Sequence, residues 1–207
     1  MTWPEIVSIA RQATASISWQ EALGFVTGAI CVWLLVKENI WTWPIGIANN
    51  VFSIVVFYRA RLFGDMSLQF IFVAVSLYGW WHWLHPDDLH RGEVKVGRIS
   101  FWPAVILSAI SAVAVIILAQ GLRRIPGTTP WPDATTTCLS VTAIFMQSRK
   151  WVENWWVWIA VDVISIALYF YKHIPLFALL YAVFMVMCII GLRQWQHDLA
   201  QAKPATA

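Results

Sequence analysis

The sequence contains little charge and little cysteine. Of its 207 residues, 12% are Asp, Glu, Lys or Arg, whereas 59% are hydrophobic and the mean hydropathy is +0.64. These values lie far from those of soluble globular domains, so a soluble enzyme is not expected. The 3 cysteines fall in separate hydrophobic runs without Cys-x-x-Cys spacing, which argues against a disulfide framework or a zinc site.

Common catalytic motifs are also missing. The sequence has no GxxxxGK[ST], GxSxG or HExxH motif, so we predict no catalytic residue, no metal and no cofactor. The net charge is +3 and the basic residues are scattered through short polar segments. Nucleic-acid binding requires a clustered basic face on a folded module, so no nucleic-acid partner is expected.

Long hydrophobic runs fill most of the chain. Each is about 20 residues long, the length of a helix that crosses about 30 Å of hydrocarbon. Seven spans are expected, at 19–36, 41–58, 66–83, 100–119, 133–147, 153–171 and 175–195. The sequence therefore predicts an all-α integral membrane protein with seven transmembrane helices, the lipid bilayer as surroundings and no room for an extramembrane domain.

The two ends of the chain differ from the spans. Residues 1–18 alternate apolar and polar side chains at helical spacing, which predicts an amphipathic segment on the membrane surface and not a signal peptide. The polar tail 196–207 is expected to be disordered. Segments on the N-terminal side carry six basic residues and those on the other side eight. The positive-inside rule then places the N-terminus outside and the C-terminus in the cytoplasm.

An internal repeat appears when the chain is shifted by 112 positions. Without gaps, Trp43 falls on Trp155, Gly79 on Gly191 and Trp83 on Trp195, and Asn50 falls on Asp162. We predict a three-helix repeat A at 19–83, a loop and linker helix at 84–124, and a three-helix repeat B at 125–195. The extra helix makes the two repeats parallel, an arrangement found in secondary transporters that bind substrate near the midplane. Duplication for stability alone is the structural alternative.

One carboxylate lies in the middle of a predicted span. Asp162 is costly to insert there and is therefore a functional candidate. Trp155, Trp158 and Ser165 share its helical face. The equivalent face of the second span carries Trp43 and Asn50, and the two faces are expected to lie opposite each other.

The side chains on these faces predict the chemistry of a ligand. Indole faces stack on flat rings and attract cations, and a carboxylate reinforces that preference. Amides and hydroxyls can bind a sugar or an amide. We expect a small flat, polar and cationic substrate, bound by Trp43, Asn49, Asn50, Gln69, Tyr78, Trp155, Trp158, Asp162 and Tyr181.

Other interpretations stay open for each of these residues. Tryptophans near span ends, such as Trp43, Trp83, Trp155 and Trp195, are typical of an interfacial belt. Asn49 and Asn50 can join helices by amide hydrogen bonds. Asp162 can pair with a hydroxyl of the fifth span, at 135–137. A metal-dependent membrane enzyme using His82, His85 and His90 is a further alternative, although HxxH spacing is a weak signal.

Two sets of motifs resemble the PnuC family of nicotinamide riboside transporters. The first set is WTWPIGIANN at 41–50, RLFGDMSLQ at 61–69 and YGW at 78–80. The second is ENWWVW at 153–158, followed by Asp162, Ser165, Tyr169, Lys172 and LYA at 180–182. The resemblance covers residues 19–195.

The resemblance implies a facilitator of the bacterial inner membrane. It implies seven helices in 3+1+3 order, a fold related to the SWEET sugar transporters, commonly a homotrimer, and retention of the imported vitamin by phosphorylation in the cytoplasm. Nicotinamide riboside is the substrate it indicates first; thiamine, riboflavin and deoxynucleosides are alternatives within the family. A membrane scaffold that transports nothing is the alternative from a different class.

Overall fold

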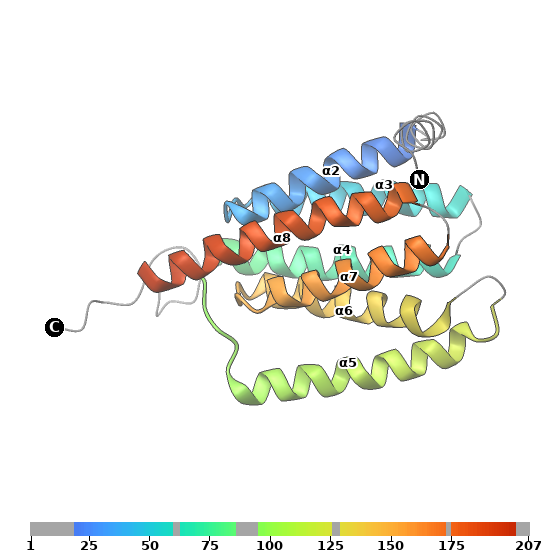
Figure 1. Ribbon diagram of the computed structural model, residues 1–207. Helices are drawn as coiled ribbons and strands as arrows, with labels where there is room; N and C mark the ends of the chain where they lie inside the picture. Colours follow the sequence, from blue (N-terminus) through green and yellow to red (C-terminus); the bar gives the residue numbers. More distant parts are fainter. Residues whose placement is uncertain (1–18, 60–62, 86–94, 126–128, 173–174, 202–207) are drawn as a thin grey trace, which may run out of the picture.

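The computed structural model describes residues 19–59, 63–85, 95–125, 129–172 and 175–201, and the amphipathic segment predicted at 1–18 lies outside them. The described residues form seven helices. Successive helices run in opposite directions along one common axis (Figure 1). They are α2 (Trp19–Val36), α3 (Thr42–Arg59), α4 (Phe63–Leu84), α5 (Phe101–Leu122), α6 (Pro130–Ser148), α7 (Asn154–Tyr171) and α8 (Pro175–Gln201). Each corresponds to one predicted span.

The last helix is longer than predicted. α8 continues past Trp195 to Gln201, into the tail that we expected to be disordered. Side chains one turn apart stabilise this extension: the Gln194 amide donates to Asp198, and Gln201 bonds His197. Polar residues can therefore extend a membrane-spanning helix beyond the bilayer once it has begun.

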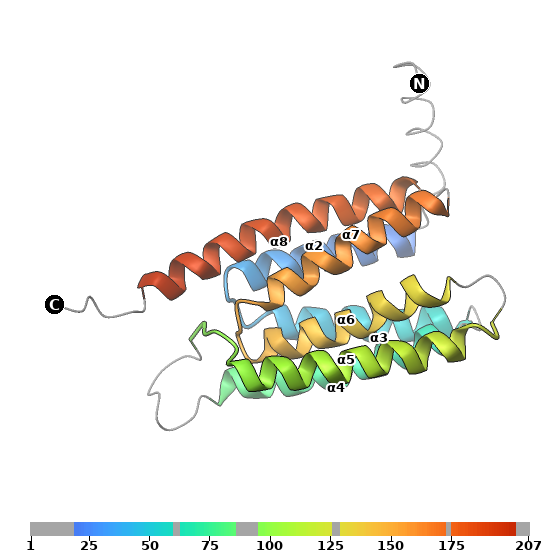
Figure 2. The same ribbon diagram turned by 60° about the horizontal axis from the view of Figure 1, so that its bottom comes forward.

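Among the described residues, length and hydropathy alone identify three helices that can cross a membrane. They are Phe101–Leu122, Asn154–Tyr171 and Phe177–Gln201. In the first of these, α5, only 6% of the apolar window is buried, and such an exposed apolar surface is typical of a lipid-facing helix. The remaining helices run alongside these three (Figure 2), as expected of a seven-helix membrane protein.

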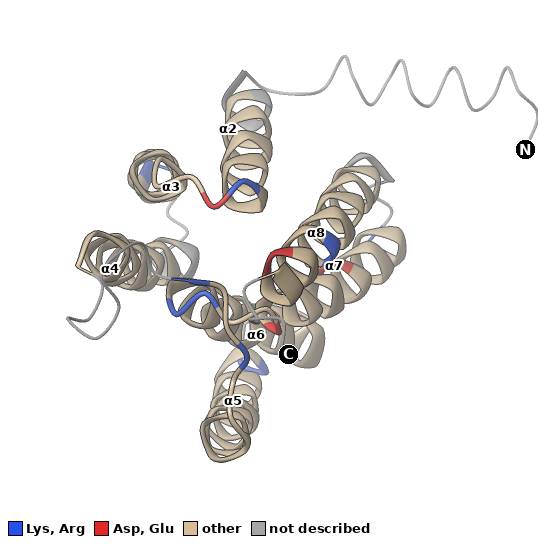
Figure 3. Cartoon of the chain, turned by 90° about the vertical axis from the view of Figure 1, so that its left-hand side faces the viewer, with Lys and Arg blue, Asp and Glu red and all other residues tan. Residues whose placement is uncertain are grey.

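Helix contacts divide the bundle into two groups of three. α3 packs on α2 and α4, and α7 packs on α6 and α8; α2 with α8 and α4 with α6 join the groups. Among the described helices α5 contacts α6 alone and lies at the edge (Figure 3). This confirms the predicted 3+1+3 order. The faces of α3 and α7 that we expected opposite each other do not pack together, because these two helices are not in contact.

Equivalent residues in the two groups make equivalent contacts. The rings of Trp43 and Trp83 meet edge to face at 5.4 Å, and those of Trp155 and Trp195 do the same at 5.4 Å. Gly79 lies against the ring of Trp43, and Gly191 against the ring of Trp155. Because all four indoles are buried, the belt interpretation is wrong for them, whereas exposed Trp81 and Trp102 can fill that role.

Candidate functional site

Asp162 lies on α7 and is 3% exposed. The Cys188 thiol of α8 is in hydrogen-bond contact with its carboxylate. Its Oδ2 atom has no hydrogen-bond partner within the described part of the chain. The alternative partner in the fifth span is not supported for Thr136, because that hydroxyl donates to backbone oxygens of Pro132 and Asp133 on its own helix. One oxygen of a buried carboxylate is thus left for another donor or a cation.

Aromatic side chains of α7 and α8 form a cluster that reaches this carboxylate through Tyr181. The rings of Tyr169 and Tyr181 stack at 5.4 Å, and Phe177 stacks on Tyr169 at 5.2 Å. The Tyr181 hydroxyl is in hydrogen-bond contact with Tyr169 and Ser165 and interacts electrostatically with Asp162. The structure therefore brings Asp162 and Tyr181, two of the predicted binding residues, into one cluster.

Phe184 connects this cluster to the other repeat. Its ring lies edge-on to Tyr181, with centroids 6.1 Å apart, and 5.8 Å from the ring of Phe25 on α2. A methyl group added at Gly28 would lie 3.3 Å from the Phe184 ring. The close approach of α2 and α8 thus places the Asp162 cluster beside the boundary between the repeats.

Repeat A carries uncharged polar groups at the equivalent positions. Asn50 corresponds to Asp162, Ser76 to Cys188 and Gln69 to Tyr181 in the 112-residue register. Ser76 is 3% exposed, like Cys188 at 4%, whereas Asn49, Asn50 and Gln69 are half-buried. One half therefore offers a carboxylate with aromatic rings, and the other offers amides.

Two buried indole N–H groups lack partners. Nε1 of Trp43 and Nε1 of Trp155 have no acceptor among the residues described. Burial of an unsatisfied donor costs about 1–3 kcal/mol, so a water molecule or a ligand is the expected acceptor. Since these two atoms occupy equivalent positions, the repeats present matched donors.

The other predicted residues occupy different places. Trp158 is half-buried and packs against the hydrophobic core near Trp155. The exposed Tyr78 accepts a hydrogen bond from Arg149 and stacks on His82 and Phe145, none of which belongs to the Asp162 cluster. In the described residues no three His, Cys, Asp or Glu side chains gather as a metal site; His90 lies outside them.

Five residues of the cluster were not predicted as site residues: Ser165, Tyr169, Phe177, Phe184 and Cys188. Ser165 and Phe184 did carry a signal, because each is matched by an identical residue in the other repeat, Ser53 and Phe72. Cys188 carried a weaker signal, because it is aligned with Ser76, another small side chain, in the 112-residue register. A small side chain in a hydrophobic span is typical of packing, and nothing in the local sequence reveals its contact with Asp162.

Two parallel three-helix repeats, a peripheral linker helix and a buried carboxylate at the boundary are the features of a membrane transporter. A known crystal structure, that of the vitamin B3 transporter PnuC, has the same fold, with a TM-score of 0.70 at 22% identity, covering 98% of this chain and 94% of that one. Residues 18–197 match the family described as nicotinamide mononucleotide transporter, and the chain belongs to that family.

Curated relatives of this chain are transporters and not enzymes. The nicotinamide riboside transporter PnuC of Escherichia coli (strain K12) is 27% identical over 204 residues, covering 86% of this chain and 85% of that protein. The riboflavin/roseoflavin transporter RibM of Streptomyces davaonensis is 29% identical over 184 residues, with the same coverage of 86% and 85%. Similar chains therefore carry different flat vitamins.

Proposed function

We propose that this protein imports a flat cationic vitamin by facilitated diffusion with alternating access, and that nicotinamide riboside is the substrate. The observation that carries the proposal is the buried Asp162 with one unpaired oxygen beside stacked tyrosine rings. A pyridinium ring combines positive charge with a flat aromatic face, so it matches both features.

Charge distinguishes the candidate substrates. A mononucleotide carries a phosphate, which the Asp162 carboxylate would repel. Riboflavin stacks equally well but is neutral, so it gains little from the carboxylate. Thiamine is also a flat cation and is the nearest competitor; deoxynucleosides are neutral and depend mainly on amide contacts.

The proposed binding site spans both repeats. Asp162 and Tyr181 come from repeat B and contact the cationic ring, with Trp158 on the same helix. Trp155, whose ring is enclosed by Gly191 and Trp195, offers its indole N–H. Trp43, Asn49, Asn50 and Gln69 come from repeat A and bind the sugar and the amide, whereas Tyr78 is hydrogen-bonded to Arg149 and is left out of the proposed site. The unpaired indole nitrogens of Trp43 and Trp155 support this assignment, because a ligand between the repeats can accept from both.

A thermal-shift panel tests the proposed substrate. Nicotinamide riboside should raise the unfolding temperature of the purified protein, since a ligand that binds the folded state stabilises it. Asp162→Asn should abolish the shift, whereas Asp198→Asn, which removes a carboxylate from the last turns of α8, should retain it. A shift with riboflavin alone would contradict the cation preference.

Uptake into liposomes tests the proposed transport activity against the scaffold alternative. Labelled nicotinamide riboside should equilibrate across the membrane, and an enclosed kinase that phosphorylates it should increase accumulation. A scaffold predicts no uptake of any vitamin or nucleoside under either condition.

We also propose an orientation of the chain in the membrane and an oligomeric state. We place the N-terminus outside and the C-terminus in the cytoplasm of the bacterial inner membrane, with repeats 19–83 and 125–195 moving against each other. We also propose a homotrimer, for which the exposed apolar faces of α5 offer surface. Light scattering of the detergent-solubilised protein measures its mass, and protease protection in vesicles determines its orientation.

A further inference from the structure

Two turns at one end of the bundle have an unusual backbone. Glu38, after α2, and Lys150, after α6, are the non-glycine residues with positive φ in the described chain, at 52° and 51°. They are separated by 112 positions. The turns also share hydrogen bonds: Asn39 N donates to Leu34 O and Trp151 N to Met146 O. Both helices therefore end in the same Schellman-type turn.

Glycine is the usual residue at this position of such a turn, because a side chain there strains the backbone. Both repeats nevertheless carry a charged residue at it. Strain retained at equivalent positions indicates that the side chains themselves have a role.

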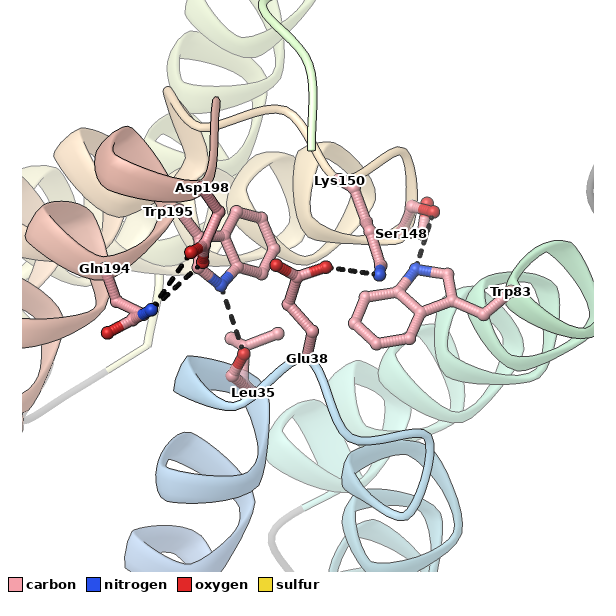
Figure 4. Close-up of polar contacts among 8 residues, drawn as sticks. All are labelled: Leu35, Glu38, Trp83, Ser148, Lys150, Gln194, Trp195 and Asp198. Atoms are coloured by element: carbon pink, nitrogen blue, oxygen red, sulfur yellow. Dashed lines mark hydrogen bonds and ion pairs between the residues drawn. The ribbon is translucent and has the colours of Figure 1, made fainter. Parts of the chain in front are cut away.

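The two side chains meet across the boundary between the repeats. Lys150 Nζ lies 2.6 Å from Glu38 Oε2 (Figure 4), and the Lys150 side chain is only 4% exposed. Lys150 Nζ also lies 4.4 Å from the centroid of the Trp83 ring. A carboxylate and an indole face thus hold the ammonium group, and each half of the protein supplies one charge of the ion pair.

Two indole hydrogen bonds reinforce this contact, and their donors, Trp83 and Trp195, are equivalent in the 112-residue register. Trp83 Nε1 of repeat A donates to Ser148 O of repeat B at 3.1 Å, and Trp195 Nε1 of repeat B donates to Leu35 O of repeat A at 3.3 Å (Figure 4). Each repeat therefore ties its last helix to the end of the first helix of the other. At the opposite end, the described ion pair Lys172–Asp133 lies within repeat B.

A cavity of about 810 Å³ opens outside this contact. It is lined by polar and aromatic residues that include Lys37, Asn39, Trp41 and Asp198, with Glu38, Lys150 and Trp83 in its wall. Charged groups at this end gather on the turns between helices (Figure 3). The cavity is wide enough for a vitamin-sized molecule, and the ion pair forms part of its wall.

We propose that the Glu38–Lys150 ion pair is a latch that closes this end of the transport path. This inference rests on the proposed transport by alternating access. Opening this end requires the ends of α2 and α6 to separate, which breaks the ion pair and the two indole hydrogen bonds together. Because the charges belong to different repeats, their contact forms only in the closed arrangement, and it biases the equilibrium between closed and open states.

Cysteine accessibility tests the latch. Leu192 is buried in the core cluster that also contains Leu35 and Trp83, so Leu192→Cys, in a protein whose native cysteines are replaced by serine, reports on opening. Glu38→Gln and Lys150→Gln should each raise its labelling by a membrane-impermeant maleimide about tenfold, one decade in the open-to-closed ratio. Lys172→Gln, which breaks the ion pair inside repeat B, should leave the rate within about twofold of the parent.

Two further variants distinguish an effect of the ion pair from an effect of the strained backbone turn. Glu38→Gly removes the backbone strain as well as the carboxylate; a purely structural turn predicts unchanged labelling, whereas a latch predicts the same rise as Glu38→Gln. Exchanging the charges, with Glu38→Lys and Lys150→Glu together, should bring labelling back toward the parent. Unchanged labelling in the single variants would overturn the latch.

The outcome is independent of the identity of the substrate. Thermal shifts with nicotinamide riboside are measured on the same variants, and preserved binding shows that each is folded. If the parent binds no vitamin, the proposed function fails, while the labelling rates still decide whether the ion pair controls access to this end.

Discussion

Replacing Gly191 with alanine should destabilise the protein by a clash that can be worked out from the geometry. An added Cβ would lie 2.4 Å from Cη2 and from Cζ2 of Trp155, and 2.7 Å from its Cζ3. Carbon atoms prefer separations of about 3.5–4.0 Å. The ring is 0% exposed and also packs on the Trp195 ring at 5.4 Å, so it cannot move away without disturbing the core.

Such overpacking costs about 1–3 kcal/mol. For a chain of this size, a loss of about 2 kcal/mol lowers the unfolding temperature by about 4–8 °C. The assay is thermal unfolding of the purified protein in detergent, followed by tryptophan fluorescence. Gly79→Ala should behave alike, because its Cβ would lie 2.4 Å from Cη2 of Trp43.

Gly24→Ala on α2 is the matched control. A methyl group there meets nothing within 4 Å, so the better helix propensity of alanine should leave stability unchanged or slightly higher. Trp155→Phe combined with Gly191→Ala should recover part of the loss, giving a coupling of about 0.5–3 kcal/mol. The reasoning is refuted if Gly191→Ala is as stable as Gly24→Ala.

Three more variants test other contacts. Asp162→Asn should weaken binding of nicotinamide riboside by about tenfold or more, since it removes the charge that attracts the pyridinium, and should spare riboflavin; calorimetric titration with both ligands measures this. Trp83→Phe should lose about 1–3 kcal/mol of stability in thermal unfolding, because the Ser148 carbonyl is left without its donor. Cys188→Ser should preserve binding, as serine stands at the equivalent position of repeat A, whereas Cys188→Val should reduce the affinity measured in the same titration, since it leaves Asp162 without this partner.

The helices and their order could be predicted because the hydrophobic runs match the thickness of a bilayer. α2 begins and ends at the predicted residues, and α7 begins one position late, at Asn154. The repeat was also visible, since Trp43, Gly79 and Trp83 have identical counterparts at a fixed offset. These features depend on local composition and on spacing along the chain.

The burial of particular tryptophans and charges could not be predicted. A tryptophan near a span end can face lipid or a glycine on the next helix, and only the packing decides between them: Trp43 is 1% exposed, whereas Trp41 is 61% exposed. A lysine between two predicted spans is expected to face solvent, yet the left-handed turn directs Lys150 onto Glu38 and Trp83. Tyr78 shares a sequence motif with the predicted site, but its partner is Arg149.

The helix that joins the repeats gives access to their motion. Since α5 packs on α6 alone among the described helices, we expect it to move together with repeat B and independently of repeat A. Its outer faces touch no other described helix, so a spectroscopic label placed there leaves the substrate path intact. The distance between a label on α5 and a second label on α3 would therefore follow the relative displacement of the two repeats during each transport cycle.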